Sequence, residues 1–339
     1  MQTKTMKAIL QHQFGGPDVL RYEDTPVPTL GSGEVLVRVH AVGLNPPDWY
    51  LREGYKMLPP EWQPQVHFPV ILGTDISGVV ESVSGDVTGF SPGDEVYAMV
   101  RFPSGLAGGS RSYAQYVSVP ASELALKPVG VDHVHAAAAP MSLLTAWQFM
   151  VDLGHNQPNP LQSHQHQPVP LAGKTVLVNG AAGGVGQFAV QIAKWKGAHV
   201  IAVAAGAQEA FVRGLGADEF IDYRTTRAEQ QVHELDLVID AVGGPTTGRF
   251  LPTLKRGGAL FPVFPLGLAS NDQAEKLGVT VSSVQVRSSG QQLAELASLL
   301  AAGTIRVGVD STFALADARL AHERAARGGT QGKIVLTVA

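Results

Sequence analysis

A glycine-rich turn between a predicted strand and a predicted helix constrains the fold of this chain more than any other feature. The turn reads Asn179-Gly-Ala-Ala-Gly-Gly-Val-Gly186; it follows the apolar run 175–179 and precedes residues 185–196, where apolar side chains recur with helical spacing. A strand, a glycine turn and a helix in this order form the local structure that binds the pyrophosphate of a dinucleotide. The turn therefore predicts a Rossmann unit in this part of the chain.

Three positions of the turn correspond to the glycines of the G-x-G-x-x-G pattern, and they hold Ala181, Gly183 and Gly186. Without a Cβ, Gly183 lets a pyrophosphate approach the backbone, and Gly186 lets the helix pack closely on the sheet. The free N–H groups and the positive dipole end at the start of the helix attract phosphate charge. We predict cofactor contacts at Gly180, Ala182, Gly183, Gly184 and Val185.

The rest of the chain falls into two kinds of pattern. Apolar strands predicted at 175–179, 199–204, 219–221, 235–240, 258–263 and 279–284 alternate with helices such as 185–196 and 209–215. This alternation is typical of a parallel sheet covered on both faces. Residues 1–125 instead show short strands between glycine turns, at 34–42, 71–80 and 95–99, which predict a small barrel or sandwich. We further expect helices at 135–152 and 291–302 and a last strand at 333–338.

Composition narrows the classes of function. The 339 residues favour two domains, and 45% hydrophobic with 16% charged residues is typical of a packed globule. A net charge of −4 with dispersed Lys and Arg argues against a nucleic acid or an anionic membrane as partner. The absence of cysteine excludes disulfides, thiolate metal sites and cysteine nucleophiles. No signal peptide or membrane-spanning run is present, so we expect a cytoplasmic protein.

The end of the strand at 199–204 selects the cofactor. An NAD site usually has Asp or Glu there, to bind the ribose 2′-hydroxyl. Here Ala204 is followed by Ala-Gly206-Ala-Gln, and the first acid is Glu209. Because no carboxylate repels a 2′-phosphate, we predict NADPH, with Ala204 and Gly206 beside it. The 2′-phosphate then needs a partner from elsewhere in the chain, and the candidates are Arg213, Tyr223 and Arg224.

Residues 155–170 contain four prolines and three histidines. An exposed surface loop is the simplest interpretation. Histidine-rich tracts can also bind a metal ion, but this density of proline disfavours a preformed site. Neither interpretation links the segment to the predicted cofactor site.

Motifs distributed over nearly the whole chain resemble those of the zinc-independent quinone oxidoreductases (zeta-crystallin-like) of the medium-chain dehydrogenase/reductase superfamily. Besides the glycine turn they are LGTDISG at 72–78, SPGDEVY at 91–97, YAQYV at 113–117, LTAW at 144–147, LGAD at 215–218, DAVGG at 240–244 and GKIVL at 332–336. The resemblance implies an α/β plus β fold: a GroES-like β-barrel catalytic domain at 1–125 and 288–339, with a Rossmann domain, a doubly wound parallel sheet, inserted at 126–287.

The resemblance also bears on the reaction. Zinc-dependent relatives place a cysteine and a histidine in turns that here read Gly43-Leu44-Asn45 and Gly73-Thr74-Asp75. An amide and a hydroxyl cannot replace thiolate and imidazole on Zn²⁺. Without a device that ionises an alcohol, hydride transfer from NADPH to a quinone or an α,β-unsaturated carbonyl compound is the simpler reaction, because the product oxyanion needs only a donor.

Site residues follow from the resemblance by position. It places residues 45–55 beside the nicotinamide, where Asn45 would contact cofactor or substrate. Tyr50, Arg52 or Tyr55 would donate to the developing oxyanion. Further cofactor contacts are implied for Thr145, Ala241, Val242, Phe264 and Lys333.

Two further expectations remain open from the sequence. Family members are often homodimers joined through an edge strand of the Rossmann sheet, and 279–284 would be that strand. The alternative function is an NADPH-binding protein with a structural or redox-sensing role and little catalysis.

Overall fold

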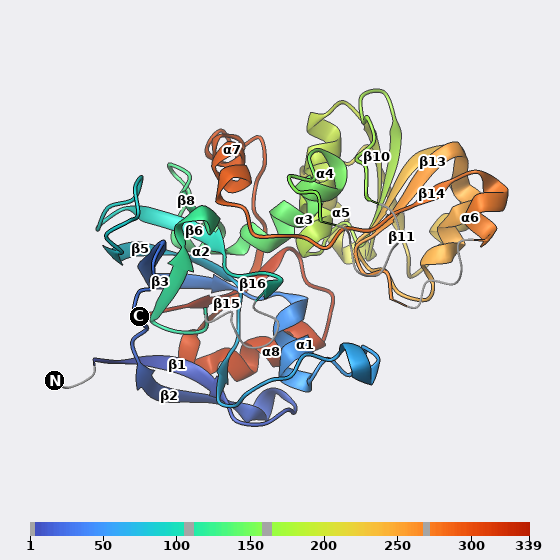
Figure 1. Ribbon diagram of the computed structural model, residues 1–339. Coiled ribbons are helices and arrows are strands. Elements are labelled where there is room, and N and C mark those ends of the chain that lie inside the picture. Colours follow the sequence, from blue (N-terminus) through green and yellow to red (C-terminus); the bar gives the residue numbers. More distant parts are fainter. Residues whose placement is uncertain (1–3, 105–111, 158–164, 267–271) are drawn as a thin grey trace. The chain divides into compact units, whose positions relative to one another are not determined.

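The computed structural model describes residues 4–104, 112–157, 165–266 and 272–339, which form two compact units (Figure 1). Unit 1 consists of residues 1–144, 287–303 and 307–339, and unit 2 of residues 145–286 and 304–306. The chain therefore leaves unit 1 to build unit 2 and returns, as expected for an inserted domain. Residues 126–144 pack with unit 1, because helix α2 (His133–Ala138) contacts strands β3 and β5 there.

Unit 1 is built mainly from antiparallel strands. Its larger sheet has the order β15-β16-β3-β5-β6-β8, with β7 also paired to β3, and its smaller sheet has the order β2-β1-β4. The strands are β1 (Thr5–Gln11), β2 (Leu20–Pro26), β3 (Glu34–Gly43), β4 (Val70–Ile71), β5 (Asp75–Val83), β6 (Glu95–Met99), β7 (Tyr116–Pro120), β8 (Leu124–Leu126), β15 (Val309–Ala314) and β16 (Lys333–Thr337). The helices besides α2 are α1 (Pro46–Glu53), α7 (Gly290–Ala301) and α8 (Ala318–Ala326), and α3 (Pro140–Met150) runs on into unit 2.

Two predicted elements of unit 1 are interrupted for local reasons. The strand predicted at 71–80 breaks between β4 and β5, because Gly73 has a φ of +96°, which lies outside the strand region. A Cβ at this position would lie 2.0 Å from the Ser112 hydroxyl oxygen, so the position requires glycine. The single helix predicted at 135–152 is two helices, α2 and α3, and Pro140 is the first residue of the second. Proline favours a first helical position over a helix interior.

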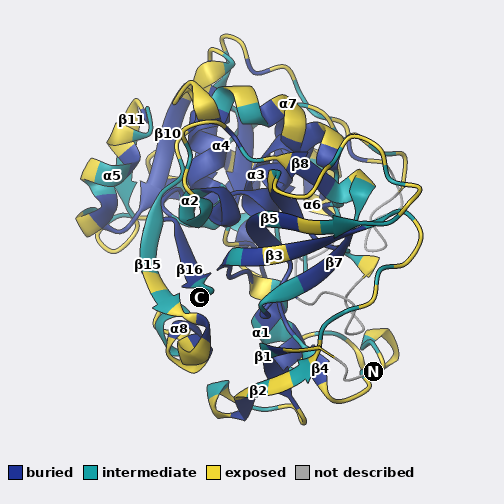
Figure 2. Ribbon diagram, turned by 90° about the vertical axis from the view of Figure 1, so that its left-hand side faces the viewer, coloured by how far each residue is buried: buried dark blue, intermediate teal, exposed yellow. Residues whose placement is uncertain are grey.

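Unit 2 is a parallel sheet of strand order β11-β10-β9-β12-β13-β14. This 3-2-1-4-5-6 order is that of the Rossmann fold, so the predicted fold is confirmed. The strands are β9 (Thr175–Asn179), β10 (His199–Ala204), β11 (Glu219–Asp222), β12 (Leu235–Asp240), β13 (Leu254–Pro262) and β14 (Thr280–Val281). The helices are α4 (Gly184–Trp195), α5 (Glu209–Gly214) and α6 (Asp272–Leu277), and Figure 2 shows β10 and most of α4 in the colour of buried residues.

One histidine of the 155–170 segment is part of the unit 2 interior, contrary to the simple picture of a surface loop. His166 is 3% exposed; its Nδ1 lies 2.9 Å from the Ser282 hydroxyl and its Nε2 lies 2.7 Å from the Phe149 carbonyl oxygen. Its ring also packs edge-on against Phe261. The segment is therefore attached to unit 2 through a buried side chain.

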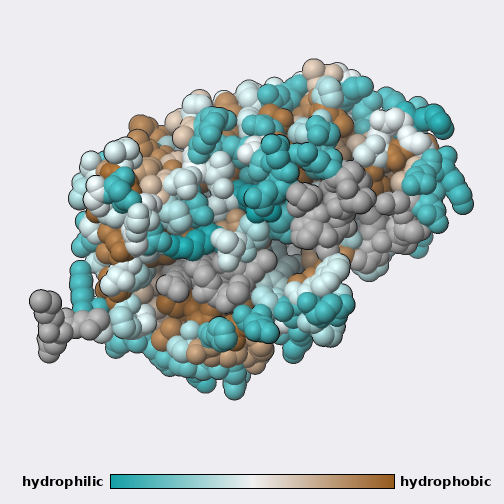
Figure 3. Space-filling view, viewed as in Figure 1, coloured by the Kyte–Doolittle hydropathy of each residue, from teal (hydrophilic) through white to brown (hydrophobic). Residues whose placement is uncertain are grey.

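Hydrophilic and apolar residues are mixed over the face shown in Figure 3. Large exposed apolar residues of the described ranges, such as Trp62, Val129 and Leu320, come from distant parts of the sequence. Folded proteins ordinarily carry such residues on their surfaces. None of the described helices is both long and apolar enough to span a bilayer.

Candidate functional site

The predicted phosphate-binding turn in unit 2 has the backbone that its glycines require. Gly180 has a φ of +74°, and a Cβ on Gly186 would lie 2.1 Å from the Gly180 carbonyl oxygen. Gly183 is the N-cap of α4. A Cβ on Gly183 would meet only this same oxygen among the described atoms within 4 Å, at an ordinary contact distance of 3.4 Å. Packing inside the protein thus explains Gly186, whereas the space beside Gly183 fits a ligand group lying against the backbone.

Asp240, at the end of β12, organises the turn next to the glycines. Its Oδ1 accepts hydrogen bonds from Asn179 Nδ2 at 2.7 Å, from the Val242 N–H at 3.1 Å and from the Gly243 N–H at 3.0 Å. Its Oδ2 accepts from the Thr247 hydroxyl at 2.6 Å. A buried carboxylate with four donors is well compensated, so we assign Asp240 a structural role at this edge of the sheet.

Three predicted cofactor residues lie around this turn. Val242 is 60% exposed, and its Cγ2 is 2.9 Å from the position of a Cβ on Gly180. A Cβ on Gly243 would lie 2.4 Å from the Phe264 carbonyl oxygen. The structure thus brings Ala241, Val242 and Phe264 to the same edge of the sheet as the phosphate-binding turn.

The end of β10 meets the turn that follows β11. Ala204 pairs with Asp222, and the Tyr223 N–H donates to the Ala204 carbonyl oxygen at 3.2 Å. A Cβ on Gly206 would lie 2.5 Å from Asp222 Oδ2, while Oδ1 accepts the Arg224 backbone N–H at 2.9 Å. The predicted residues Ala204, Gly206 and Tyr223 are therefore neighbours. Reasoning from the end of β10 alone missed the carboxylate of Asp222, which the adjacent strand supplies.

Two predicted residues of unit 2 have other surroundings. Thr145 is buried within α3. Arg213, on α5, donates to Glu209 Oε1 at 2.8 Å and to the Asp218 carbonyl oxygen at 3.3 Å. Of the three candidate partners for a 2′-phosphate, Tyr223 and Arg224 are the two that stand directly after β11.

In unit 1, the predicted site segment begins with helix α1, for which sequence analysis made no prediction, and Asn45 is its N-cap. Pro46 and Pro47 fill the first helical positions, where a missing N–H breaks no helical hydrogen bond. The Asn45 N–H donates to Asp48 Oδ2 at 2.8 Å, so this carboxylate closes the first turn. This local hydrogen bond fixes the backbone of Asn45 at the start of α1.

Lys333, the first residue of β16, binds this helix start. Its Nζ donates to Asn45 Oδ1 and to the Leu44 carbonyl oxygen. Asn45 Nδ2 in turn donates to the Thr74 hydroxyl at 3.2 Å and to the Gly43 carbonyl oxygen at 3.3 Å. Because an ammonium group can only donate, Lys333 determines which way the Asn45 amide is turned.

Two buried carboxylates accompany the Lys333 ammonium. Burial raises the pKa of Asp48 to about 7 and that of Asp75 to about 6, and the charge of Lys333 opposes both shifts. Burial also lowers the pKa of Lys333, against the attraction of the two acids. Both Asp75 oxygens lie 3.1 Å from the Met141 N–H. The pKa values of the two carboxyl groups therefore lie close to neutral pH, which is common where acid–base chemistry occurs.

The three predicted donors of α1 and the turn after it differ in exposure. Tyr50 is half-buried and its ring centre lies 6.4 Å from that of Tyr55, which is buried. Burial raises the pKa of both phenols, so both are protonated at neutral pH. Arg52 is 4% exposed and donates to His322 Nδ1 at 2.7 Å and to the Gly15 carbonyl oxygen at 3.1 Å. These contacts favour a positioning role for Arg52 over the predicted donation to substrate.

Sequence analysis missed the two buried carboxylates, Asp48 and Asp75. It also missed His322, which accepts from Arg52, and Tyr113, whose hydroxyl donates to Asp48 Oδ2 at 3.0 Å. The Asn-x-x-Asp spacing of a helix cap was a signal for Asp48. The others come together only through pairing of distant segments, and no local pattern marks them.

Known families match both parts of the chain. The Alcohol dehydrogenase GroES-like domain matches residues 31–129, and the Zinc-binding dehydrogenase model matches residues 215–336. The chain is 34% identical to NAD(P)H oxidoreductase RTN4IP1, mitochondrial, of Mus musculus, over 99% of this chain and 90% of that protein. It is 32% identical to Quinone-oxidoreductase QR1, chloroplastic, of Triphysaria versicolor, over 99% of both. The solved quinone oxidoreductase of Coxiella burnetii superposes with a TM-score of 0.84 at 30% identity, covering 99% of this chain and 100% of that one.

A Rossmann unit with a dinucleotide turn, inserted into a GroES-like unit, defines the class of medium-chain dehydrogenases/reductases. Within that superfamily the chain belongs to the quinone oxidoreductase family.

Proposed function

We propose that this protein is an NADPH-dependent oxidoreductase that reduces quinones or α,β-unsaturated carbonyl compounds by hydride transfer. The space beside the Gly183 backbone at the start of α4 is the observation that carries the proposal, because packing within the protein does not account for it. The printed names of relatives, an NAD(P)H oxidoreductase and a quinone oxidoreductase, support the same class.

The residues present fit a dinucleotide. The turn at 180–185 would hold the pyrophosphate, and Ala241, Val242 and Phe264 would line the nicotinamide ribose. When bound, the nicotinamide supplies the hydride. The chain itself has to orient the reacting carbon, exclude water and provide a proton for the product oxyanion.

For the choice between NADPH and NADH, we propose NADPH. No acid follows Ala204 directly, and Tyr223 and Arg224 stand in the turn after β11. The carboxylate of Asp222 opposes this preference, so the choice depends on whether Arg224 compensates it. Dissociation constants for the two cofactors test this directly, and equal or tighter binding of NADH would refute it.

The residues at the zinc-ligand positions of metal-dependent relatives do not fit a zinc ion. Asn45 and Thr74 are hydrogen-bonded to each other, and the Lys333 ammonium is bonded to the Asn45 oxygen. A second cation at this point would be repelled by Lys333, and neither ligand type suits Zn²⁺. Among the described residues, no group of three or more His, Asp or Glu side chains is placed to hold a metal ion. We therefore propose a reaction without metal.

We propose that Asn45, Tyr50 and Tyr55 lie near the reacting atoms, and that one of the two phenols donates to the product oxyanion. Hydride addition to the electron-poor carbon leaves an oxyanion, which accepts a hydrogen bond or proton from a phenol or from water. Because burial holds the pKa of Tyr50 and Tyr55 above the usual range, both phenols can donate throughout the neutral range. We expect a Tyr50→Phe, Tyr55→Phe double variant to lose at least ~10-fold in kcat/KM.

A nucleotide-binding protein with little catalysis is the competing function, and the same experiment separates the two. NADPH consumption is measured with a panel of quinones and enones, using wild type and the double tyrosine variant. Tight NADPH binding without turnover of any acceptor favours the binding protein. Turnover that falls in the variant while NADPH affinity is kept favours the reductase.

The assembly and compartment predictions stay proposals. β14 is an edge strand of the unit 2 sheet, and a homodimer joined there would continue the sheet. Light scattering coupled to size exclusion, with Val281→Lys as the interface variant, would test the dimer.

A cytoplasmic location is not supported by the relatives, whose printed names place them in mitochondria or chloroplasts.

A further inference from the structure

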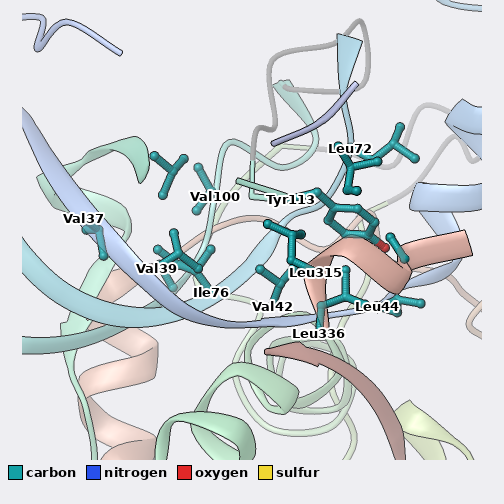
Figure 4. Packing of buried hydrophobic residues seen from close by; sticks show 14 of the residues in the cluster. Val37, Val39, Val42, Leu44, Leu72, Ile76, Val100, Tyr113, Leu315 and Leu336 are labelled. Atoms are coloured by element: carbon teal, nitrogen blue, oxygen red, sulfur yellow. The ribbon is translucent and has the colours of Figure 1, made fainter. Parts of the chain in front are cut away.

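Four buried polar side chains form a continuous line of hydrogen bonds inside the core of unit 1. Arg52 Nη1 lies 2.7 Å from His322 Nδ1, His322 Nε2 lies 3.1 Å from the Tyr113 hydroxyl, and that hydroxyl lies 3.0 Å from Asp48 Oδ2. None is more than 4% exposed. They come from α1, α8 and the segment before β7, and Figure 4 shows Tyr113 surrounded by apolar side chains such as Leu72.

The direction of every hydrogen bond in this line follows from its Arg52 end. A guanidinium can only donate, so His322 Nδ1 must be an acceptor and carries no proton. The proton of the neutral imidazole is then on Nε2, and Nε2–H donates to the Tyr113 oxygen. The Tyr113 hydroxyl has its own proton left to donate to Asp48 Oδ2. All the donors therefore point toward the carboxylate.

We propose that Arg52 is a positioning residue that fixes the tautomer of His322 and thereby directs the Tyr113 hydroxyl onto Asp48, favouring the ionised form of this carboxylate. The consequence for the reaction rests on the proposed function. Ionised Asp48 balances the Lys333 ammonium, and that ammonium sets the orientation of Asn45. Arg52 would thus act on the site through four residues without touching substrate or cofactor.

The groups around Asp48 show why a hydrogen bond from Tyr113 matters for its ionisation. The groups facing it are the Tyr113 hydroxyl, the Asn45 N–H, the Lys333 ammonium, the Asp75 carboxylate and the Tyr55 phenol. Burial raises the pKa of Asp48, and the hydrogen bond from Tyr113 is among the contacts that lower it. A Tyr113 hydroxyl turned the other way would remove this donor. Burial, followed by the charge of Arg52, lowers the pKa of His322 to about 3, so its imidazole is neutral.

Two substitutions of Arg52 test whether the direction of the hydrogen bonds matters, and not only the presence of a polar side chain next to His322. Arg52→Lys keeps a cation that can only donate, so the line retains its direction. Arg52→Gln offers either an amide donor or a carbonyl acceptor, so His322 can carry its proton on Nδ1 and the line can reverse. Tyr113→Phe removes the hydroxyl that takes part in the hydrogen bonds to both His322 and Asp48, and leaves the Arg52 contacts to Gly15 and Glu53 in place.

The test is NMR on the full chain, with ¹⁵N shifts giving the His322 tautomer and the ¹³C shift of the Asp48 carboxyl followed from pH 4 to 9. We expect the Nε2–H tautomer in wild type and in Arg52→Lys. In Arg52→Gln and in Tyr113→Phe, we expect the Asp48 titration to move up by about one pH unit or more, since one lost charge-assisted hydrogen bond corresponds to that size of shift. The acid limb of kcat/KM should move with it.

An Nδ1–H tautomer in wild type would overturn the inference, and so would Asp48 titrations that agree between Arg52→Gln and Arg52→Lys. An Asp48 titration that shifts as expected while the acid limb of kcat/KM stays in place would refute the link to catalysis alone. If no quinone or enone is reduced by wild type, the proposed function fails, but the two NMR measurements still decide the direction of the line.

Discussion

Replacing Lys333 by Met removes a buried ammonium whose charge favours the ionised forms of two buried carboxylates, Asp48 and Asp75. The methionine matches the length of the side chain but leaves Asp48 and Asp75 without their cation and the Leu44 carbonyl without its donor. Removing a charge that stabilises buried charges of opposite sign costs up to about 3–5 kcal/mol of unfolding free energy, because the remaining charges stay desolvated. We expect a loss of this size at pH 8, where both acids are ionised in the wild type.

The penalty should shrink as the pH falls. The folded-state pKa of Asp48 is about 7 and that of Asp75 about 6, both above the ordinary value of 3.8. For such groups the folded state gains protons between the folded and the unfolded pKa, so their contribution is fully favourable below about pH 4 and is lost as the pH rises through 6 and 7. At pH 5 both acids are neutral and no longer need Lys333. The loss should then be about 1–2 kcal/mol, the value of the missing hydrogen bonds.

Urea unfolding at pH 5 and pH 8 measures both values. In a Trp147→Phe, Trp195→Phe background, the remaining tryptophans, Trp49 and Trp62, both report on unit 1. Lys7→Met is the matched control, because Lys7 pairs with Asp24 at 2.8 Å on the surface, and we expect little change at either pH. The same loss for Lys333→Met at both pH values would contradict the assignment of Asp48 and Asp75 as carboxylates that depend on Lys333.

Three other predictions concern unit 2. Gly186→Ala should destabilise it by about 1–3 kcal/mol in thermal or urea unfolding, since the new methyl group would overlap the Gly180 carbonyl oxygen. Gly183→Ala should leave stability nearly unchanged but weaken NADPH binding ~10-fold or more in titration calorimetry; unchanged affinity would mean that no pyrophosphate lies there. His166→Leu should cost about 1–3 kcal/mol by leaving the Phe149 carbonyl and the Ser282 hydroxyl without this partner, whereas the exposed His233→Leu should cost little.

The Rossmann unit could be read from the sequence because its signals are local. The bounds predicted for β9, β10 and β12 coincide with the observed strands, since each is a short apolar run ended by polar or small residues. The prediction for β14 was too long, at 279–284 against Thr280–Val281. Apolar character there reflects burial of Val279 and Val284 rather than strand pairing.

The candidate site in unit 1 was predictable only in part. Asn45 and Lys333 were identified by resemblance, but their contact joins residues 288 positions apart, and no sequence periodicity encodes such a pair. Helix α1 was not predicted, although Pro46 and Pro47 are well accommodated in a first helical turn. Arg52 was predicted as a donor from its chemistry, and its partner His322 belongs to a helix that sequence analysis did not predict.

Deuterium transfer from NADPH labelled at nicotinamide C4 is the most direct test of hydride transfer to a conjugated acceptor. The two C4 positions are labelled in separate samples, and an enone that the enzyme consumes is recovered and analysed by NMR. We predict deuterium on the β-carbon of the product from one of the two samples, with the α-hydrogen derived from solvent. Consumption of NADPH with no deuterium at the β-carbon from either sample, or no reduction of any enone or quinone, would contradict the proposed function.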